Sequence, residues 1–212
     1  NLIVENGLAV NGAGAYYHNA NNSVIEDCVF NNNFASSSGG AITSDNSNLT
    51  ISNSIIKNND AGEHDGGGFG IFNNSLIDIV NCEIDNNVAW HSGGIYTNNS
   101  EVNISKSVIS NNKSKYNGGG IIISVNASVT INQSTLVNNE AVYQGDWAAG
   151  IYGGGAIFMS PNATLNMENS IIWGNTPESI VSCDVSQGIC DNSENIIINL
   201  NYSDIESGWE GI

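Results

Sequence analysis

Apolar residues separated by a single polar residue recur along most of the chain. Side chains on a strand point alternately to opposite faces, so this period of two predicts strands with one face turned inward. No segment of useful length shows the 3.6-residue period of an amphipathic helix. The pattern therefore predicts an all-β protein. The alternating pairs are Leu49 and Ile51, Ile77 and Ile79, Val102 and Ile104, Val129 and Ile131, and Leu165 and Met167.

The predicted strands belong to a repeat. Six segments end in an asparagine that follows a large apolar residue by three positions, and successive asparagines are 26, 28, 25, 27 and 36 residues apart. A unit of this length with two or three short strands cannot bury its own apolar face, whereas stacked units bury a continuous core. The six closing asparagines are Asn33, Asn59, Asn87, Asn112, Asn139 and Asn175.

The repeat predicts a parallel β-solenoid with about 25–28 residues per coil. Its rise should be ~4.8 Å per coil, the spacing of paired strands. Leucine-rich repeats have a similar length, but their Leu-x-x-Leu-x-Leu pattern is absent. We expect the coils to occupy residues 1–181 and a closing segment to occupy residues 182–212.

The closing asparagines have two expected structural roles. A solenoid corner turns sharply, often through a left-handed φ that asparagine tolerates, and stacked amides can form a ladder of hydrogen bonds between coils. The stretch NNKSKYNGGGII at residues 111–122 looks like a glycine-rich phosphate loop, but no following helix is predicted. We therefore interpret it as scaffold, with glycines where backbones approach closely.

The residues of one repeat carry a family resemblance. Phe30 and Asn33, followed by Gly39 to Ile42, resemble the repeat of chlamydial polymorphic outer-membrane proteins. Residues 23–175 more broadly resemble right-handed parallel β-helix proteins of the pectate-lyase-like superfamily. The tail from Asn199 is similar to the closing stretch of secreted bacterial β-helix proteins. The resemblance implies a right-handed parallel β-helix, and such proteins include adhesins, polysaccharide lyases and hydrolases.

The charge balance excludes several partners. The formal net charge is −17, and four lysines are the only strong cations because arginine is absent. Nucleic-acid phosphates and anionic membrane surfaces both require clustered Lys or Arg, so neither is an expected partner. No apolar stretch is long enough to span a bilayer, which excludes membrane insertion through a helix. The chain begins with Asn instead of Met, and we expect it to be a processed or excised piece.

The four cysteines fall into two pairs. Cys28 and Cys82 hold the same repeat position two coils apart, about 9 to 10 Å if stacking is regular, so we expect free thiols that fill space inside the coils. Cys183 and Cys190 flank a short polar segment outside the repeat, where a disulfide can close. A disulfide fits an oxidising compartment, which predicts an extracellular or cell-surface location.

Loops of successive coils should gather on one edge of a solenoid. Exposed aromatic side chains stack well on sugar rings, so this edge is a candidate site for a glycan or a cell-surface ligand, although the same side chains could simply cover the edge. The ligand-binding candidates are Trp90, His91, Tyr116, Tyr143 and Trp147.

Acidic residues in the same loops suggest a cation. Calcium prefers carboxylate oxygens, and the candidate ligands are Glu63, Asp65, Glu140 and Asp146. A transition-metal site formed by His64, His91 and Asp65 is an alternative. No consensus calcium-binding loop occurs in the sequence.

Three functions fit the sequence. The first is a non-catalytic secreted or cell-surface module that acts in adhesion or as an extracellular structural element. The second is binding or degradation of polysaccharide at the loop-bearing edge, although facing carboxylates and a nucleophile elbow are not recognisable. The third is end-to-end assembly into a filament, because open strands template further strands. An enzyme is not favoured.

Overall fold

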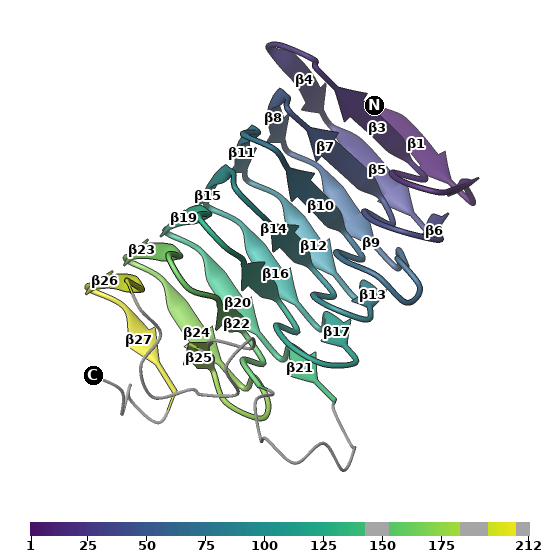
Figure 1. Ribbon diagram of the computed structural model, residues 1–212. Coiled ribbons are helices and arrows are strands. Elements are labelled where there is room, and N and C mark those ends of the chain that lie inside the picture. The colour runs from purple at the N-terminus through teal and green to yellow at the C-terminus, as the bar shows by residue number, and fades with distance from the viewer. Residues whose placement is uncertain (143–152, 183–194, 207–212) are drawn as a thin grey trace.

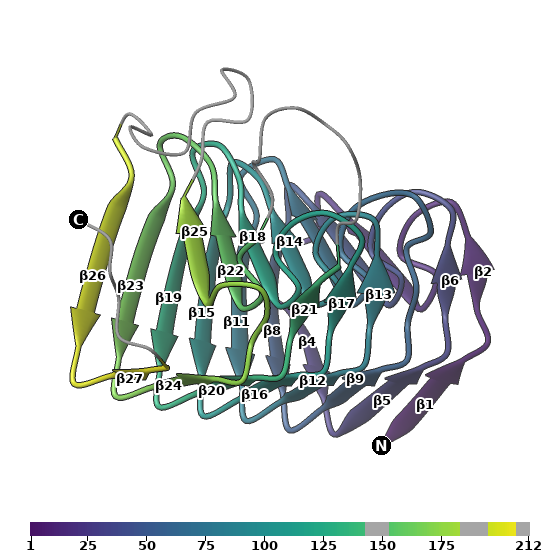
Figure 2. The same ribbon diagram turned by 90° about the horizontal axis from the view of Figure 1, so that it is seen from below.

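The computed structural model of the chain describes residues 1–142, 153–182 and 195–206. Every regular element in these residues is a β-strand, and the strands pair in parallel. The chain winds into a solenoid whose N-terminal and C-terminal ends lie far apart (Figures 1 and 2). The predicted all-β parallel solenoid is therefore confirmed. The described part of the chain contains no helix that is long and apolar enough to cross a membrane.

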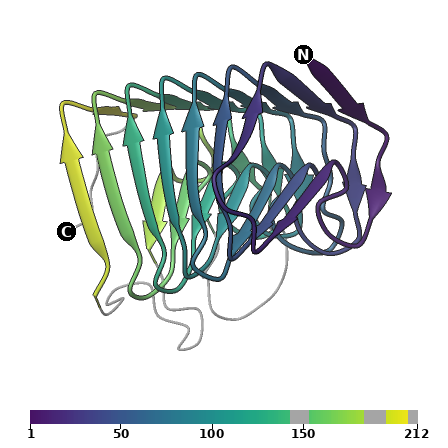
Figure 3. The same ribbon diagram turned by 90° about the horizontal axis from the view of Figure 1, so that it is seen from above.

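Three long sheets form the walls of the solenoid, and Figure 3 shows the coils following one another in order. The first sheet consists of β1 (Leu2–Glu5), β5 (Cys28–Asn31), β9 (Ile55–Lys57), β12 (Glu83–Asp85), β16 (Val108–Ser110), β20 (Thr135–Val137), β24 (Ile171–Trp173) and β27 (Asp204–Ile205). The second sheet consists of β3 (Ala15–His18), β7 (Ile42–Asp45), β10 (Phe69–Phe72), β14 (Ile95–Thr97), β18 (Ile121–Ile123), β22 (Ile157–Met159) and β25 (Ile180–Ser182). The third sheet consists of β4 (Ser23–Glu26), β8 (Asn48–Ser52), β11 (Leu76–Val80), β15 (Glu101–Ser105), β19 (Ser128–Asn132), β23 (Thr164–Glu168) and β26 (Ile197–Asn201).

Very short strands follow the first sheet in most coils and precede the loops that lead to the second sheet. Backbone bridges at Asp60 and Thr176 extend the same column. The short strands are β2 (Leu8–Ala9), β6 (Phe34–Ala35), β13 (Val88–Ala89), β17 (Lys113–Ser114) and β21 (Glu140–Ala141).

The core consists of columns of matching apolar side chains. In the first sheet Ile56 pairs with Ile84, and Ile84 pairs with Ile109, with all three fully buried. The register follows from the period of two, because a slip by one residue would turn each apolar column toward solvent. Each fully buried isoleucine contributes about 1.5–3 kcal/mol relative to an exposed one.

A buried asparagine ladder forms the corner after the first sheet. Asn87 illustrates the pattern: its backbone N–H and its Nδ2 both donate to Asn112 Oδ1 at 3.0 Å, and Nδ2 also donates to the Ile56 carbonyl at 2.9 Å. Equivalent amide-to-amide bonds join neighbouring ladder members across sequence separations of 26, 28, 25, 27 and 36 residues. Stacking in register therefore satisfies these buried amides.

The left-handed residue at this corner is not the ladder asparagine, which corrects the first of its two expected roles. The residue immediately before it takes the positive φ, as in Asn86 (φ 50°) and Asn111 (φ 53°). In the sixth segment this residue is Gly174 (φ 64°). The two roles are separate because a left-handed residue turns the chain outward, whereas the next residue points its side chain into the stack.

The corner between the third and first sheets carries a serine column. Ser107 Oγ accepts from the Cys82 backbone N–H at 3.0 Å, and Ser134 Oγ accepts from the Ser107 N–H at 3.1 Å. Cys28 and Cys82 occupy this column as free thiols, Cys82 buried and Cys28 partly buried. A small side chain is required here because the position points inward against the core.

Gly119 shows why glycine recurs before the second sheet. A Cβ atom there would lie 2.5 Å from the Glu140 backbone nitrogen and 2.6 Å from the Gly155 carbonyl oxygen. Neighbouring backbones leave no room for a side chain. The run of residues 118–120 leads directly into β18, so it has no helix N-terminus that could bind phosphate.

The stack continues beyond the expected boundary at residue 181. Strand β26 pairs with β23, and β27 pairs with β24, so residues 197–205 add to the third and first sheets. Part of the predicted closing segment therefore has coil structure. Cys183 and Cys190 lie outside the described residues, and their disulfide stays a prediction.

Candidate functional site

The loops before the second sheet stack on one another as the strands do. The backbone N–H groups of Trp90 and His91 both donate to the His64 carbonyl at 3.0 Å. One coil further along, the Tyr116 N–H donates to the Trp90 carbonyl at 3.0 Å. Asp65 forms a parallel backbone bridge with His91. Side chains from three consecutive coils are thereby placed on one edge.

Three of the predicted ligand-binding residues meet at this edge. The ring centroids of Trp90 and Tyr116 are 4.9 Å apart, and those of His91 and Tyr116 are 5.4 Å apart. We call Trp90, His91 and Tyr116 the aromatic cluster. Sequence reasoning missed Lys115, whose Nζ lies 3.6 Å from the centre of the Trp90 ring, a cation–π contact. Tyr143 and Trp147 lie outside the described residues.

Burial shifts the titration of groups beside the aromatic cluster. It raises the pKa of Asp65 to about 6, while the nearby His64 partly opposes this shift. It lowers the pKa of His91, and His64 adds to the effect by repelling a second positive charge. Burial also raises the pKa of Tyr96, with a contribution from Asp65. The edge thus contains a carboxyl group that titrates near neutral pH.

The predicted metal ligands do not assemble in the described residues. Glu140 instead pairs with Lys113, with 3.0 Å between Oε2 and Nζ. In the column of very short strands, Glu140 lies three strand spacings beyond Asp60, which is about 14 Å at ~4.8 Å each. Glu140 therefore cannot share a cation with Glu63 or Asp65. Within residues 1–142, 153–182 and 195–206, no three His, Cys, Asp or Glu side chains could hold a metal ion. Asp146 lies outside the described residues, so the calcium site and the alternative site at His64, His91 and Asp65 stay predictions.

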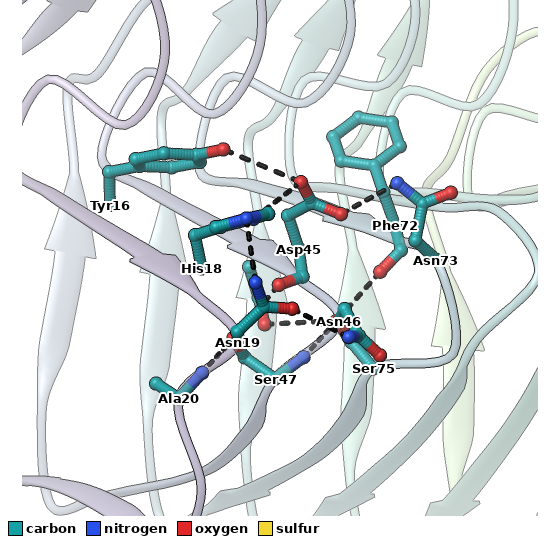
Figure 4. Close-up of polar contacts among 11 residues, drawn as sticks. Tyr16, His18, Asn19, Ala20, Asp45, Asn46, Ser47, Phe72, Asn73 and Ser75 are labelled. Carbon is teal, nitrogen blue, oxygen red and sulfur yellow. Dashed lines mark hydrogen bonds and ion pairs between the residues drawn. The ribbon is translucent and has the colours of Figure 1, made fainter.

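A second polar cluster lies at the N-terminal end of the second sheet (Figure 4). Asp45 Oδ2 lies 3.0 Å from His18 Nδ1 and accepts a long hydrogen bond of 3.4 Å from the Tyr16 hydroxyl. Asn73 Nδ2 donates to Asp45 Oδ1 at 2.6 Å, and this bond is the largest cause that lowers the pKa of Asp45. Sequence reasoning missed this cluster, although His18 and Asp45 are 27 residues apart, one coil length.

The hydrogen bonds of His18 favour one neutral tautomer. Asn46 Nδ2 donates to Asn19 Oδ1 at 2.6 Å, which leaves Asn19 Nδ2 facing His18 Nε2 at 2.8 Å. Nε2 must then accept, and Nδ1 carries the proton toward Asp45. In a Ser-His-Asp triad Nε2 would face the nucleophile, whereas here an amide occupies that place. Because Asp45 contacts both His18 of the preceding coil and Asn73 of the following coil, the cluster cross-links three successive coils on the surface.

The chain was compared with known protein families and proteins. The model of a family described as right-handed beta helix region matches residues 1–153. No curated protein matches the chain. The matched residues include the asparagine ladder as far as Asn139 and all of the aromatic cluster, and they make up well over half of the 212 residues. The chain therefore belongs to the family of right-handed β-helix regions.

Proposed function

We propose that the chain is a non-catalytic secreted or cell-surface module that makes adhesive contacts through its loop-bearing edge. The β-helix holds this edge in a fixed geometry, and the aromatic cluster is the contact surface. The single observation that carries the proposal is the stacking of Trp90, His91 and Tyr116 from two consecutive coils, with Lys115 beside them.

The contrast between this edge and the rest of the surface supports the proposal. The corners carry short Asn side chains that hydrogen-bond one another between coils, and Ser hydroxyls that accept from backbone N–H groups of the neighbouring coil. The edge instead presents large aromatic rings, a class of side chain that is enriched where proteins bind partners. Lys115 lies at this edge of a chain with net charge −17, whereas the charge of Lys113 is paired with Glu140. A local positive charge in an acidic molecule favours one orientation toward a partner.

A carbohydrate ligand is the second candidate function for the same edge. Its support is the ring surface itself, because tyrosine and tryptophan stack on flat apolar faces such as those of sugars. Lys115 already covers part of the Trp90 ring. A sugar would therefore have to displace the ammonium group or stack on Tyr116, which makes an adhesive contact with a protein or mixed surface the better-supported function.

Substitution of Trp90 tests both candidates. Purified chain should be assayed for retention on whole cells and on immobilised glycans, with Trp90→Ala as the test variant. We expect retention to fall about 10-fold or more, as for loss of an aromatic anchor. Tyr202→Gly is the control, because Tyr202 is 87% exposed and has a φ of 48° that glycine adopts easily. Equal retention of the Trp90→Ala variant and the unaltered chain would refute the role of the edge.

A further inference from the structure

A second exposed tryptophan lies on a different wall of the solenoid. Trp173 ends β24 in the first sheet, where Ile172 points into the core and Ile171 and Trp173 point outward. Trp173 is 52% exposed and Ile171 is 45% exposed. In register they pair with Val137 and Thr135 of β20. These four residues lie on the outward face of the first sheet, and we call them the β24 patch.

The ring of Trp173 is more open than that of Trp90. Among residues 1–142, 153–182 and 195–206, no aromatic ring or ammonium group stacks on Trp173. Trp90, by contrast, contacts both Tyr116 and Lys115. An exposed, unstacked indole above aliphatic side chains presents a flat apolar surface of about the size of a sugar ring.

The repeat pattern is interrupted next to this ring. Asparagine occupies the left-handed position in five consecutive corners, and glycine replaces it at Gly174. In the earlier coils the amide at this position bonds to the preceding coil, as when Asn86 Nδ2 donates to Asn58 Oδ1 at 2.7 Å. A Cβ at Gly174 would lie 2.5 Å from Asn138 Oδ1. The Asn138 amide therefore lies over bare backbone, one residue from Trp173.

The charges around the β24 patch select among ligands. Glu206 accepts a hydrogen bond from the Gly174 N–H, and Asp204 pairs with Ile171 in the register of the sheet. Lys57 belongs to the same outward column as Trp173 but is four strand spacings away, about 19 Å at ~4.8 Å each. An anionic ligand would meet two carboxylates and no nearby lysine of this column, so the patch suits an uncharged ligand.

We propose that the β24 patch binds the flat face of a neutral pyranose ring in an oligosaccharide or polysaccharide. The indole of Trp173 stacks against the C–H groups of the ring, and Ile171 and Val137 extend the apolar surface. The Asn138 amide, which lies close against Gly174, hydrogen-bonds a hydroxyl group of the sugar. An apolar floor with a few polar groups at its rim is the usual composition of a ligand site. This site is separate from the aromatic cluster and does not depend on it.

Titration of the full chain with neutral oligosaccharides tests the proposal. The probes are hexamers of glucose, mannose, xylose and N-acetylglucosamine, with oligogalacturonate as the charged counterpart. Binding is followed by the tryptophan indole N–H signals in NMR spectra. We expect at least one neutral hexamer to shift the Trp173 signal, and Trp173→Ala to weaken its binding about tenfold or more. Oligogalacturonate should bind more weakly than that hexamer.

Two further variants separate stacking from loss of fold. Gly174→Asn restores the residue of the five earlier corners and tolerates the left-handed φ. Its Cβ would displace the Asn138 amide oxygen, so it should weaken binding about 3-fold to 10-fold with an unchanged melting temperature. Val24→Ala, a change at a 66% exposed residue of β4 in the third sheet, should leave binding unchanged. The proposal is overturned if no neutral hexamer shifts the Trp173 signal, or if Trp90→Ala abolishes binding while Trp173→Ala does not. It is equally overturned if Trp173→Ala only removes a self-association seen by sedimentation.

Discussion

The asparagine ladder allows a quantitative prediction at Asn112, a fully buried member near the middle of the stack. Its side chain accepts from the N–H and the Nδ2 of Asn87 at 3.0 Å each. It donates to the Ile84 carbonyl at 2.8 Å and to Asn139 Oδ1 at 3.0 Å. Asn112→Ala removes all of these bonds without changing the backbone of the corner.

The cost follows from which groups keep a partner. Asn87 Nδ2 still donates to the Ile56 carbonyl at 2.9 Å, and Asn139 Oδ1 still accepts from the Asn112 N–H at 3.0 Å. The Asn87 N–H loses its acceptor in a dry interior, which costs about 1–3 kcal/mol. The other lost bonds contribute about 1 kcal/mol each. We expect the free energy of unfolding to fall by about 4–6 kcal/mol.

The neighbouring residue supplies a matched control. Asn111 is exposed, and its Nδ2 makes a hydrogen bond to Asp85 Oδ1 at 2.7 Å. Asn111→Gly keeps the left-handed φ, so its cost should be about 1 kcal/mol or less. Guanidinium unfolding followed by circular dichroism compares the two variants, and hydrogen exchange at the Asn87 amide reports the local effect. A ladder variant no less stable than the Asn111→Gly control would refute the reasoning.

Three other outcomes follow from the structure. The Ser114 hydroxyl is buried without a hydrogen-bond partner, in a column between Ala89 and Ala141. Ser114→Ala should therefore raise the free energy of unfolding by about 1 kcal/mol. A variant that is less stable in thermal melts would contradict this. Burial raises the pKa of Asp65 from 3.8 to about 6, so the stability that its neutral form contributes is complete below about pH 4 and is lost as the pH rises through 6. Asp65→Asn should therefore stabilise the chain by about 1–3 kcal/mol at about pH 7.5 and by little at about pH 4, and equal gains at both pH values would exclude this cause. End-to-end association predicts a mass by light scattering that grows with concentration, and a constant monomer mass would remove it.

The stacked core could be predicted because the same repeat positions carry inward apolar side chains in every coil. Ile56, Ile84 and Ile109 keep a constant distance from their closing asparagines, and this distance places them inward in one register. The sequence also contained a signal for which corner residue takes the left-handed φ. In the sixth segment glycine precedes Asn175, which indicates that the position before the ladder needs a positive φ.

The candidate site was harder to predict because its loops differ in length and composition. Backbone stacking was enough to anticipate that Trp90 and Tyr116 would meet, but the contact of Lys115 depends on a long side chain whose direction no repeat specifies. The calcium ligands were grouped because they share one edge, but each coil adds a strand spacing between residues, so Glu140 lies far from Glu63 and Asp65 along that edge. Trp173 was missed, although alternation around the inward Ile172 already turns it to solvent.

The ladder also constrains how such a molecule can change length during evolution. Because every member bonds to the equivalent residue of the adjacent coil, duplication or loss of one whole unit leaves the same bonds on both sides of the junction. Insertion within a strand would shift every later column out of alignment. The interval between Asn139 and Asn175 is 36 residues. The extra residues fall between β21 and β22, outside the strands, so the stacked columns of side chains keep their alignment. Whole units and edge loops are therefore the parts of this gene that selection can vary independently.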